Sequence, residues 1–181
     1  PILRYTELRD QLIFISSSQD LRPDVIRGLK CLSVGLFYKI FFADILRSFH
    51  ELYSLDGEGG SLDAFYSVLS YSFIIYFDFW AYSLMAMGLA KLFCIELPRN
   101  FLEPYQSLSP RSFWRRWHVT LSLWLRDYVY IKLGGNQRYA VNILIVFIAC
   151  GIWHGAGWNF ILWGGYHAVL VLSYHALRQY W

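Results

Sequence analysis

The amino-acid sequence predicts an all-α integral membrane protein, a multi-helix transmembrane bundle that includes one re-entrant or interfacial helix. Of its 181 residues, 56% are hydrophobic and only 16% are charged, whereas soluble domains contain about 25% charged residues. Aromatic residues make up 20% of the chain and include 8 Trp, a composition typical of membrane interfaces. Long uncharged stretches indicate the same class.

Two stretches are long and apolar enough to cross a bilayer. Residues 139–177 contain no Asp, Glu, Lys or Arg, and one crossing needs about 20 residues. The Gly155-Ala156-Gly157 break therefore predicts two spans there. Residues 64–90 carry a single charge, Asp78. Because the apolar run over 64–95 is long for one crossing, we expect it to tilt, to break near Asp78, or to continue as a second short helix.

The chain before residue 61 is more polar. We expect residues 1–24 to form a surface segment and Asp24 to cap a helix over 25–52. That helix carries Lys39 and Asp44, whose spacing of five does not match the i,i+4 ion pair of an α-helix. Residues 54–61 are polar and rich in Gly, which predicts a loop.

Prolines and apolar periodicity organise the segment that follows. Pro98, Pro104 and Pro110 exclude a continuous helix through 98–110. Apolar side chains then recur at spacings of three and four, which predicts a helix over 113–131. Because its arginines lie off the apolar face, we expect this helix to be interfacial or re-entrant. The face comprises Trp114, Trp117, Leu121, Trp124, Tyr128 and Ile131.

Charge predicts the topology. Residues 91–138 contain eight Lys or Arg and three Asp or Glu, so the positive-inside rule places them on the cytoplasmic side. A helix that starts near Tyr139 rises about 1.5 Å per residue, which puts His154 roughly 22 Å along it, in a hydrocarbon layer about 30 Å thick. His118, on the cytoplasmic re-entrant helix, can approach His154 from the other side.

His118 and His154, each preceded by Trp, are the strongest functional candidates. An ionisable side chain at membrane depth costs about 3 kcal/mol or more, and imidazole exchanges protons near neutral pH. The pair therefore indicates proton chemistry, and the same cost makes Asp78 a candidate. For His154 the competing interpretation is a satisfied structural group, and for the GxxxG spacing of Gly151 and Gly155 it is helix packing.

Other chemistry is not indicated by the sequence. The three cysteines lie far apart in apolar surroundings, without the spacing of a metal site or of a disulfide framework. We find no Walker loop, G-x-S-x-G elbow, H-E-x-x-H or dinucleotide motif, and topology explains the basic residues without nucleic-acid binding. The remaining histidines are interpreted as interfacial or packing groups: His50, His167 and His175.

A series of short motifs runs through nearly the whole chain. They are PILRY at 1–5, YFDF at 76–79, NF and PY within 100–105, FWRRWHVTLSLWLRDY at 113–128, LGGN at 133–136 and WHGAGW at 153–158. In this order they resemble the motifs of the membrane-bound O-acyltransferases, most closely the bacterial branch that O-acetylates alginate and similar polysaccharides. The family often has FSGYSDMAIG where this chain has FWAYSLMAMG. Leu84 replaces the second Asp, which allows a glycan other than alginate.

The resemblance implies a ring of tilted helices around a tunnel that crosses the membrane. Residues 1–181 would be part of such a domain, a fragment without its N- and C-terminal helices. His154 would be the catalytic base, and His118 the family's other conserved polar site. No metal or bound cofactor is implied. Further residues would line the tunnel or contact substrate: Asp78, Trp117, Asp127, Asn136 and Trp153.

The resemblance also implies an activity, the transfer of an acetyl group from a cytoplasmic thioester, acetyl-coenzyme A or another acyl-CoA, toward an extracytoplasmic polysaccharide such as alginate. The setting would be the lipid bilayer of the bacterial inner membrane, and an acetyl-accepting partner protein outside it would pass the group on. Arg115 and Arg116 can hold either lipid headgroups or coenzyme phosphates. Two alternatives remain: D-alanyl transfer to teichoic acid or acylation of lipids, and a proton-coupled transporter, although no inverted repeat is visible.

Overall fold

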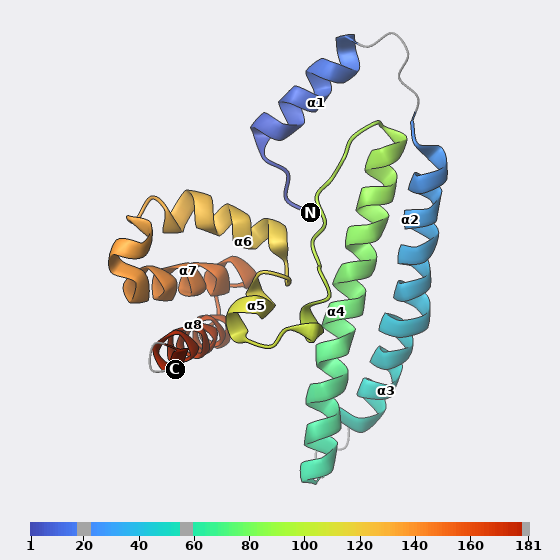
Figure 1. The fold of residues 1–181 in the computed structure, drawn as a ribbon. Helices are drawn as coiled ribbons and strands as arrows, with labels where there is room; N and C mark the ends of the chain where they lie inside the picture. Colours follow the sequence, from blue (N-terminus) through green and yellow to red (C-terminus); the bar gives the residue numbers. More distant parts are fainter. Residues whose placement is uncertain (18–22, 55–59, 179–181) are drawn as a thin grey trace. The chain divides into compact units, whose positions relative to one another are not determined.

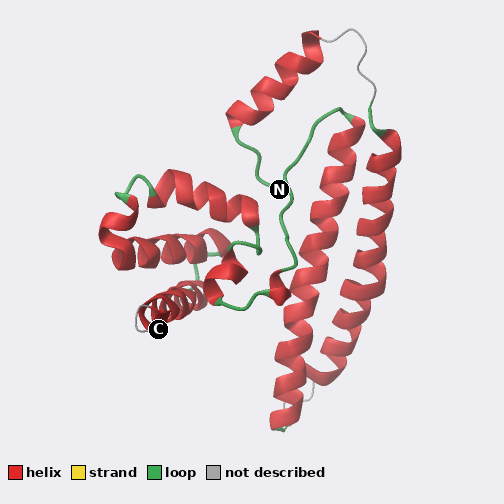
Figure 2. Cartoon of the chain, in the orientation of Figure 1, coloured by secondary structure: helices red, strands yellow, loops and turns green. Residues whose placement is uncertain are grey.

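The computed structural model describes residues 1–17, 23–54 and 60–178. These residues form helices joined by turns and loops (Figure 1) and contain no strand (Figure 2), which confirms the all-α prediction. The chain divides into two compact units, one of residues 3–99 with Pro1 and one of residues 100–181 with Ile2. Within the described residues, three helical segments are long and apolar enough to cross a membrane: Ser61–Leu92, Gly135–His154 and Trp158–Arg178.

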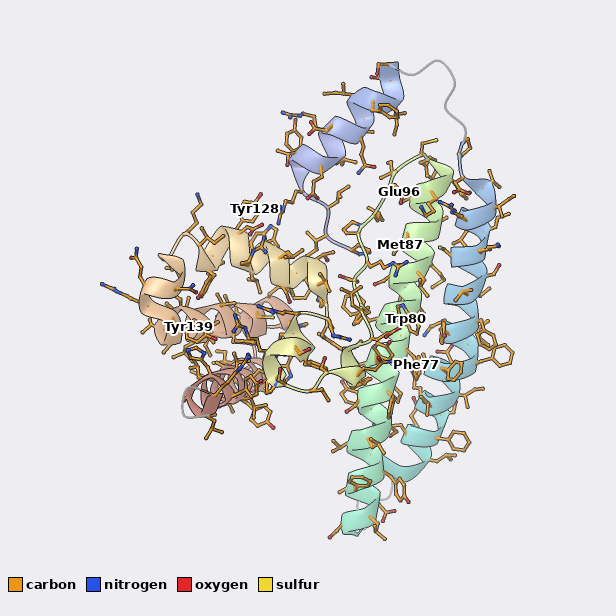
Figure 3. The ribbon with its side chains drawn as sticks, viewed as in Figure 1. Phe77, Trp80, Met87, Glu96, Tyr128 and Tyr139 are labelled. Atoms are coloured by element: carbon orange, nitrogen blue, oxygen red, sulfur yellow. The ribbon has the colours of Figure 1, made fainter. Side chains whose placement is uncertain are left out.

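The first unit contains a helical hairpin (Figure 1). Helix α2, Val25–Phe37, continues through a π-helical segment, η1, Tyr38–Asp44, into α3, Ile45–Ser54. This composite helix packs along α4, Ser61–Leu92. Aromatic rings lie in the contact between η1 and α4. Trp80 lies 4.4 Å from Tyr38, and Phe77 lies 4.8 Å from Phe42, measured between ring centroids. Figure 3 labels Phe77 and Trp80 on α4.

The start of the chain contains a helix that the sequence did not predict. Residues Tyr5–Ser17 form α1, where we expected only a polar surface segment. Its Gln11 side chain donates from Nε2 to the Glu96 carbonyl at 3.1 Å and accepts the Glu96 N–H at 2.7 Å, and these bonds hold α1 to the chain after α4. Asp24 caps α2 as predicted, since its side chain accepts the Arg27 N–H at 3.1 Å. Most of the predicted 54–61 loop lies outside the described residues.

The π-helix corrects the expectation for Lys39 and Asp44. A π-helix bonds residue i to residue i+5, so their spacing of five brings Lys39 Nζ within 2.7 Å of Asp44 Oδ1. Lys39 Nζ also lies 2.9 Å from Asp78 Oδ1, and Arg47 Nη2 lies 2.9 Å from Asp78 Oδ2. Two cations therefore neutralise the Asp78 carboxylate, and α4 continues through it without the break near Asp78 that was one expected alternative.

The second unit is a set of short helices around a longer helical pair. The short helices are η2, Pro104–Gln106; α5, Pro110–Trp114; α6, Val119–Leu125; the π-helical η3, Arg126–Tyr130; and η4, Gly135–Arg138. The pair is α7, Tyr139–His154, and α8, Trp158–Arg178, so the predicted helix start and the predicted break are both confirmed. The buried core of this unit comprises Leu121, Leu125, Phe147, Cys150, Ala168 and Val171.

Two glycines allow α7 and α8 to touch. A Cβ atom on Gly151 would lie 2.3 Å from the Phe160 carbonyl oxygen, and one on Gly164 would lie 2.3 Å from the Phe147 carbonyl oxygen. Real Cβ atoms do not approach so closely, so only glycine permits this contact. The helix-packing interpretation of Gly151 is therefore confirmed, as expected where small residues line a helix interface.

The prediction of a single helix over 113–131 is wrong. α5 ends at Trp114, α6 begins at Val119, and a π-helix follows. The reason is the extended chain at 100–102, which takes hydrogen bonds that a continuous helix would use: the Arg116 carbonyl accepts the Leu102 N–H at 3.0 Å, and the Asn100 carbonyl accepts the Val119 N–H at 2.9 Å. The spacing of apolar residues cannot predict hydrogen bonds with a distant segment such as 100–102.

Candidate active site

A cavity of about 250 Å³ lies within the second unit, among α5, α6, η3, α7 and α8. Its walls are largely apolar, and three arginines, Arg111, Arg115 and Arg126, also line it. His118 and His154 both line this one cavity. The fold thus brings together the two histidines that the sequence singled out, although they belong to separate helices.

His118 is the N-cap residue of α6 and only 4% exposed. Its backbone is left-handed, with φ 43° and ψ 54°, which costs roughly 1–2 kcal/mol in a residue that has a Cβ; such strain clusters at functional sites. Burial, and secondly the charge of nearby His154, lower the pKa of His118 to about 4. Its imidazole is therefore neutral at pH 7, with one nitrogen to donate and one to accept.

His154 is the last residue of α7, where the chain leaves the helix at Gly155. Its ring meets Trp163 of α8 edge-on, with centroids 5.1 Å apart, and its neighbour Trp153 at 4.9 Å. Trp153 also meets the His118 ring edge-on at 5.6 Å, so one indole contacts both histidines. The His154 side chain is exposed on the described chain, which leaves its ring open to a substrate. Its depth in the bilayer stays a prediction.

Asn136 and Trp117, two predicted substrate residues, also line the cavity. The Asn136 side-chain oxygen accepts the Tyr130 hydroxyl at 2.7 Å. The Trp117 ring stacks on Phe113 at 5.4 Å. Both side chains are therefore held in defined positions on the wall, and a role in substrate contact stays a prediction.

Asp127 and Asp78, two predicted acidic site residues, are engaged in ion pairs. Asp127 Oδ1 lies 2.7 Å from Arg126 Nε, so it orients an arginine that lines the cavity. Asp78 belongs to the first unit, where Lys39 and Arg47 neutralise it. Each carboxylate has a positioning role that needs no substrate, and any further role in substrate contact stays a prediction.

The other histidines have ordinary structural surroundings. His167 packs against Trp114 at 5.0 Å and Trp163 at 4.8 Å, and His175 packs against Tyr139 (Figure 3) at 4.4 Å, which confirms the packing interpretation for both. His50 Nδ1 lies 3.0 Å from the Ser70 hydroxyl. Across the part of the chain that the structure describes, no cluster of His, Cys, Asp or Glu is arranged to hold a metal ion.

Sequence reasoning missed two residues beside the histidines. Cys150 is buried and lines the cavity, one helical turn before His154. Their i,i+4 spacing on a predicted helix was a usable signal, since such residues share a face. Asn100 is 1% exposed and accepts the Thr120 hydroxyl at 2.7 Å. Its only sequence signal was its place in the NF motif.

The family follows from the whole chain rather than from one motif. A family model for the membrane-bound O-acyltransferases matches residues 1–180, so the chain belongs to that family. Within the described residues, three helices are long and apolar enough to cross a membrane, which agrees with membership of a membrane-bound family.

The chain is similar to individual members of the family as well. The chain is 40% identical to a peptidoglycan O-acetyltransferase of Helicobacter pylori, over 99% of this chain and 36% of that protein. It is 38% identical to the probable alginate O-acetylase AlgI of Azotobacter vinelandii, over 98% of this chain and 36% of that protein. A teichoic acid D-alanyltransferase of Streptococcus thermophilus is 28% identical over 99% of this chain. The chain thus spans about a third of the length of its first two relatives.

Proposed function

We propose that the protein is a membrane-embedded O-acyltransferase of the bacterial inner membrane. It moves an acetyl group from a cytoplasmic thioester such as acetyl-coenzyme A toward an extracytoplasmic polysaccharide, and a partner protein outside the membrane accepts the group. The observation that carries the proposal is the single cavity that His118 and His154 share. Family membership and the two O-acetylating relatives support the reaction class.

The chemistry assigns one histidine to each of two tasks. An acceptor hydroxyl is a weak nucleophile until a base removes its proton, and His154, with its exposed ring, takes that proton. The hydroxyl oxygen then attacks the thioester carbonyl carbon, the C–S bond breaks, and the thiolate leaves with the proton from His154. His118, neutral and buried, donates a hydrogen bond to the carbonyl oxygen as charge develops there.

The lining of the cavity suits an acyl-coenzyme A donor. Its wall is largely apolar, and a hydrogen bond in apolar surroundings is stronger than one in water. Arg111, Arg115 and Arg126 line the same cavity, and arginine pairs well with phosphate groups of the kind that coenzyme A carries. Asp127 holds Arg126 in place.

A second candidate is D-alanyl transfer to teichoic acid by the same chemistry. The D-alanyltransferase of S. thermophilus, similar over 99% of this chain, favours it. The proton-coupled transporter is favoured by no observation among the described residues.

The test supplies membranes containing the protein with radiolabelled acetyl-coenzyme A and, in parallel, with a labelled D-alanyl thioester. We expect acetyl label in an extracytoplasmic glycan or protein, lost in His154→Ala and retained in His50→Ala, whose histidine lies in the first unit. Labelling from the D-alanyl donor alone would favour the second candidate, D-alanyl transfer. His154-independent labelling would contradict both.

A further inference from the structure

Asn100 is the most deeply buried polar residue close in space to His118. It is 1% exposed, and two successive N–H groups of α6 point at it: Val119 donates to its carbonyl oxygen at 2.9 Å, and Thr120 donates to its side-chain oxygen at 3.4 Å. The Thr120 hydroxyl donates to that side-chain oxygen at 2.7 Å. These bonds hold the two residues that directly follow His118.

The position of His118 explains why the first N–H groups of α6 need a hydrogen-bond acceptor from another part of the chain. The first N–H groups of a helix have no partner within it, and the N-cap side chain usually accepts one of them. His118 occupies the N-cap position of α6, yet its side chain makes no capping bond. Asn100 supplies the acceptors instead, so the imidazole can line the cavity.

The same bonds hold a backbone conformation that His118 does not favour. A left-handed residue other than glycine persists only where its surroundings over-determine it. On the preceding side, the Arg116 carbonyl accepts the Leu102 N–H at 3.0 Å. On the following side, Thr120 is 5% exposed, and its hydroxyl accepts the Ile2 N–H at 2.9 Å while it donates to Asn100. Hydrogen bonds therefore hold the chain on both sides of His118.

We propose that Asn100, acting through Thr120, is the positioning residue that caps α6 in place of His118 and thereby aims the His118 imidazole into the cavity. The consequence for catalysis rests on the proposed function. The geometric claim, that the ring is held by Asn100, does not.

The first experiment measures acyl transfer by Asn100→Ala, Thr120→Val and the matched control Thr120→Ser. Valine has the shape of threonine without the hydroxyl, whereas serine keeps it. We expect kcat to fall about 100-fold in the first two variants, because small displacements of catalytic groups have large effects. The KM for the donor should stay within about twofold, since the aim of His118 affects the reacting atoms more than donor binding. Wild-type kcat in folded Thr120→Val, or an equal loss in Thr120→Ser, would overturn the proposal.

The second experiment needs no activity. Diethyl pyrocarbonate modifies accessible neutral imidazole. The folded protein is labelled, and mass spectrometry of its peptides then gives the rate at His118, with His50 as the internal reference. Loss of a helix cap should speed His118 modification about tenfold in Asn100→Ala and Thr120→Val, and Thr120→Ser should match wild type. An unchanged His118 rate overturns the proposal whatever the transfer assay gives. If wild type transfers no label, the proposed function fails while this rate still decides the role of Asn100.

Discussion

Gly164→Ala tests whether the α7–α8 contact sets the position of His154. The new Cβ would lie 2.3 Å from the Phe147 carbonyl oxygen, whereas ordinary contact begins at 3.4 Å, so the helices must separate by about 1 Å. Overpacking of this kind costs about 1–3 kcal/mol, offset by about 1 kcal/mol of helix propensity. The neighbouring Gly165→Ala is the matched control, because its Cβ would meet only Ile148 Cδ1, at 3.9 Å.

The assay combines thermal unfolding of the detergent-purified protein with acyl transfer in membranes. Gly165→Ala should gain about 1 kcal/mol from propensity alone, so the two variants should differ by about 1–3 kcal/mol. A shift of about 1 Å at the end of α7 that carries His154 should lower kcat about 100-fold in Gly164→Ala only. Equal stability and equal activity in the two variants would show that the α7–α8 contact does not set the position of His154.

Three further predictions concern the charge network, pH and the cavity. Asp78→Asn should destabilise the protein by about 1–3 kcal/mol, and more than Asp44→Asn does in the same thermal assay, because Asp78 neutralises two cations and Asp44 one. Since burial lowers the pKa of His118 to about 4 from 6.5, the unfolded chain binds more protons in that interval. This histidine should therefore lower stability by up to about 3 kcal/mol as pH drops from 6.5 to 4, and His118→Asn should remove that contribution. Cys150→Trp should abolish acyl transfer by filling the cavity, whereas Cys150→Ser should retain it. Equal transfer rates in the two variants would show that the reaction does not use this cavity.

The parts of the fold that follow from local pattern were predictable from the sequence. The uncharged run after Tyr139 and the Gly155-Ala156-Gly157 break located α7 and α8. The Asp24 cap followed from residue type alone. The cost of an ionisable group at membrane depth singled out His118 and His154, and the two side chains line one cavity.

Features that depend on a distant partner were not predictable in this way. The end of α5 at Trp114 needs the chain at 100–102 to take hydrogen bonds from 116–119. The Lys39–Asp44 pair needs a π-helix, and its spacing of five argued against a pair as long as an α-helix was assumed. Asn100 gave no periodic signal, because its role arises only where α6 meets it.

A double-mutant comparison of acetyl-transfer rates tests whether His118 and His154 act together at one cavity. The variants are His154→Ala, His118→Leu, His118→Asn and the double His118→Leu/His154→Ala, with His50→Ala as control. We predict background rates for His154→Ala and no further loss in the double variant, because residues that act as a unit are not additive; His118→Asn should retain more activity than His118→Leu. A wild-type rate in His154→Ala, or independent multiplicative losses from the two histidines, would show that the two side chains do not act as a unit.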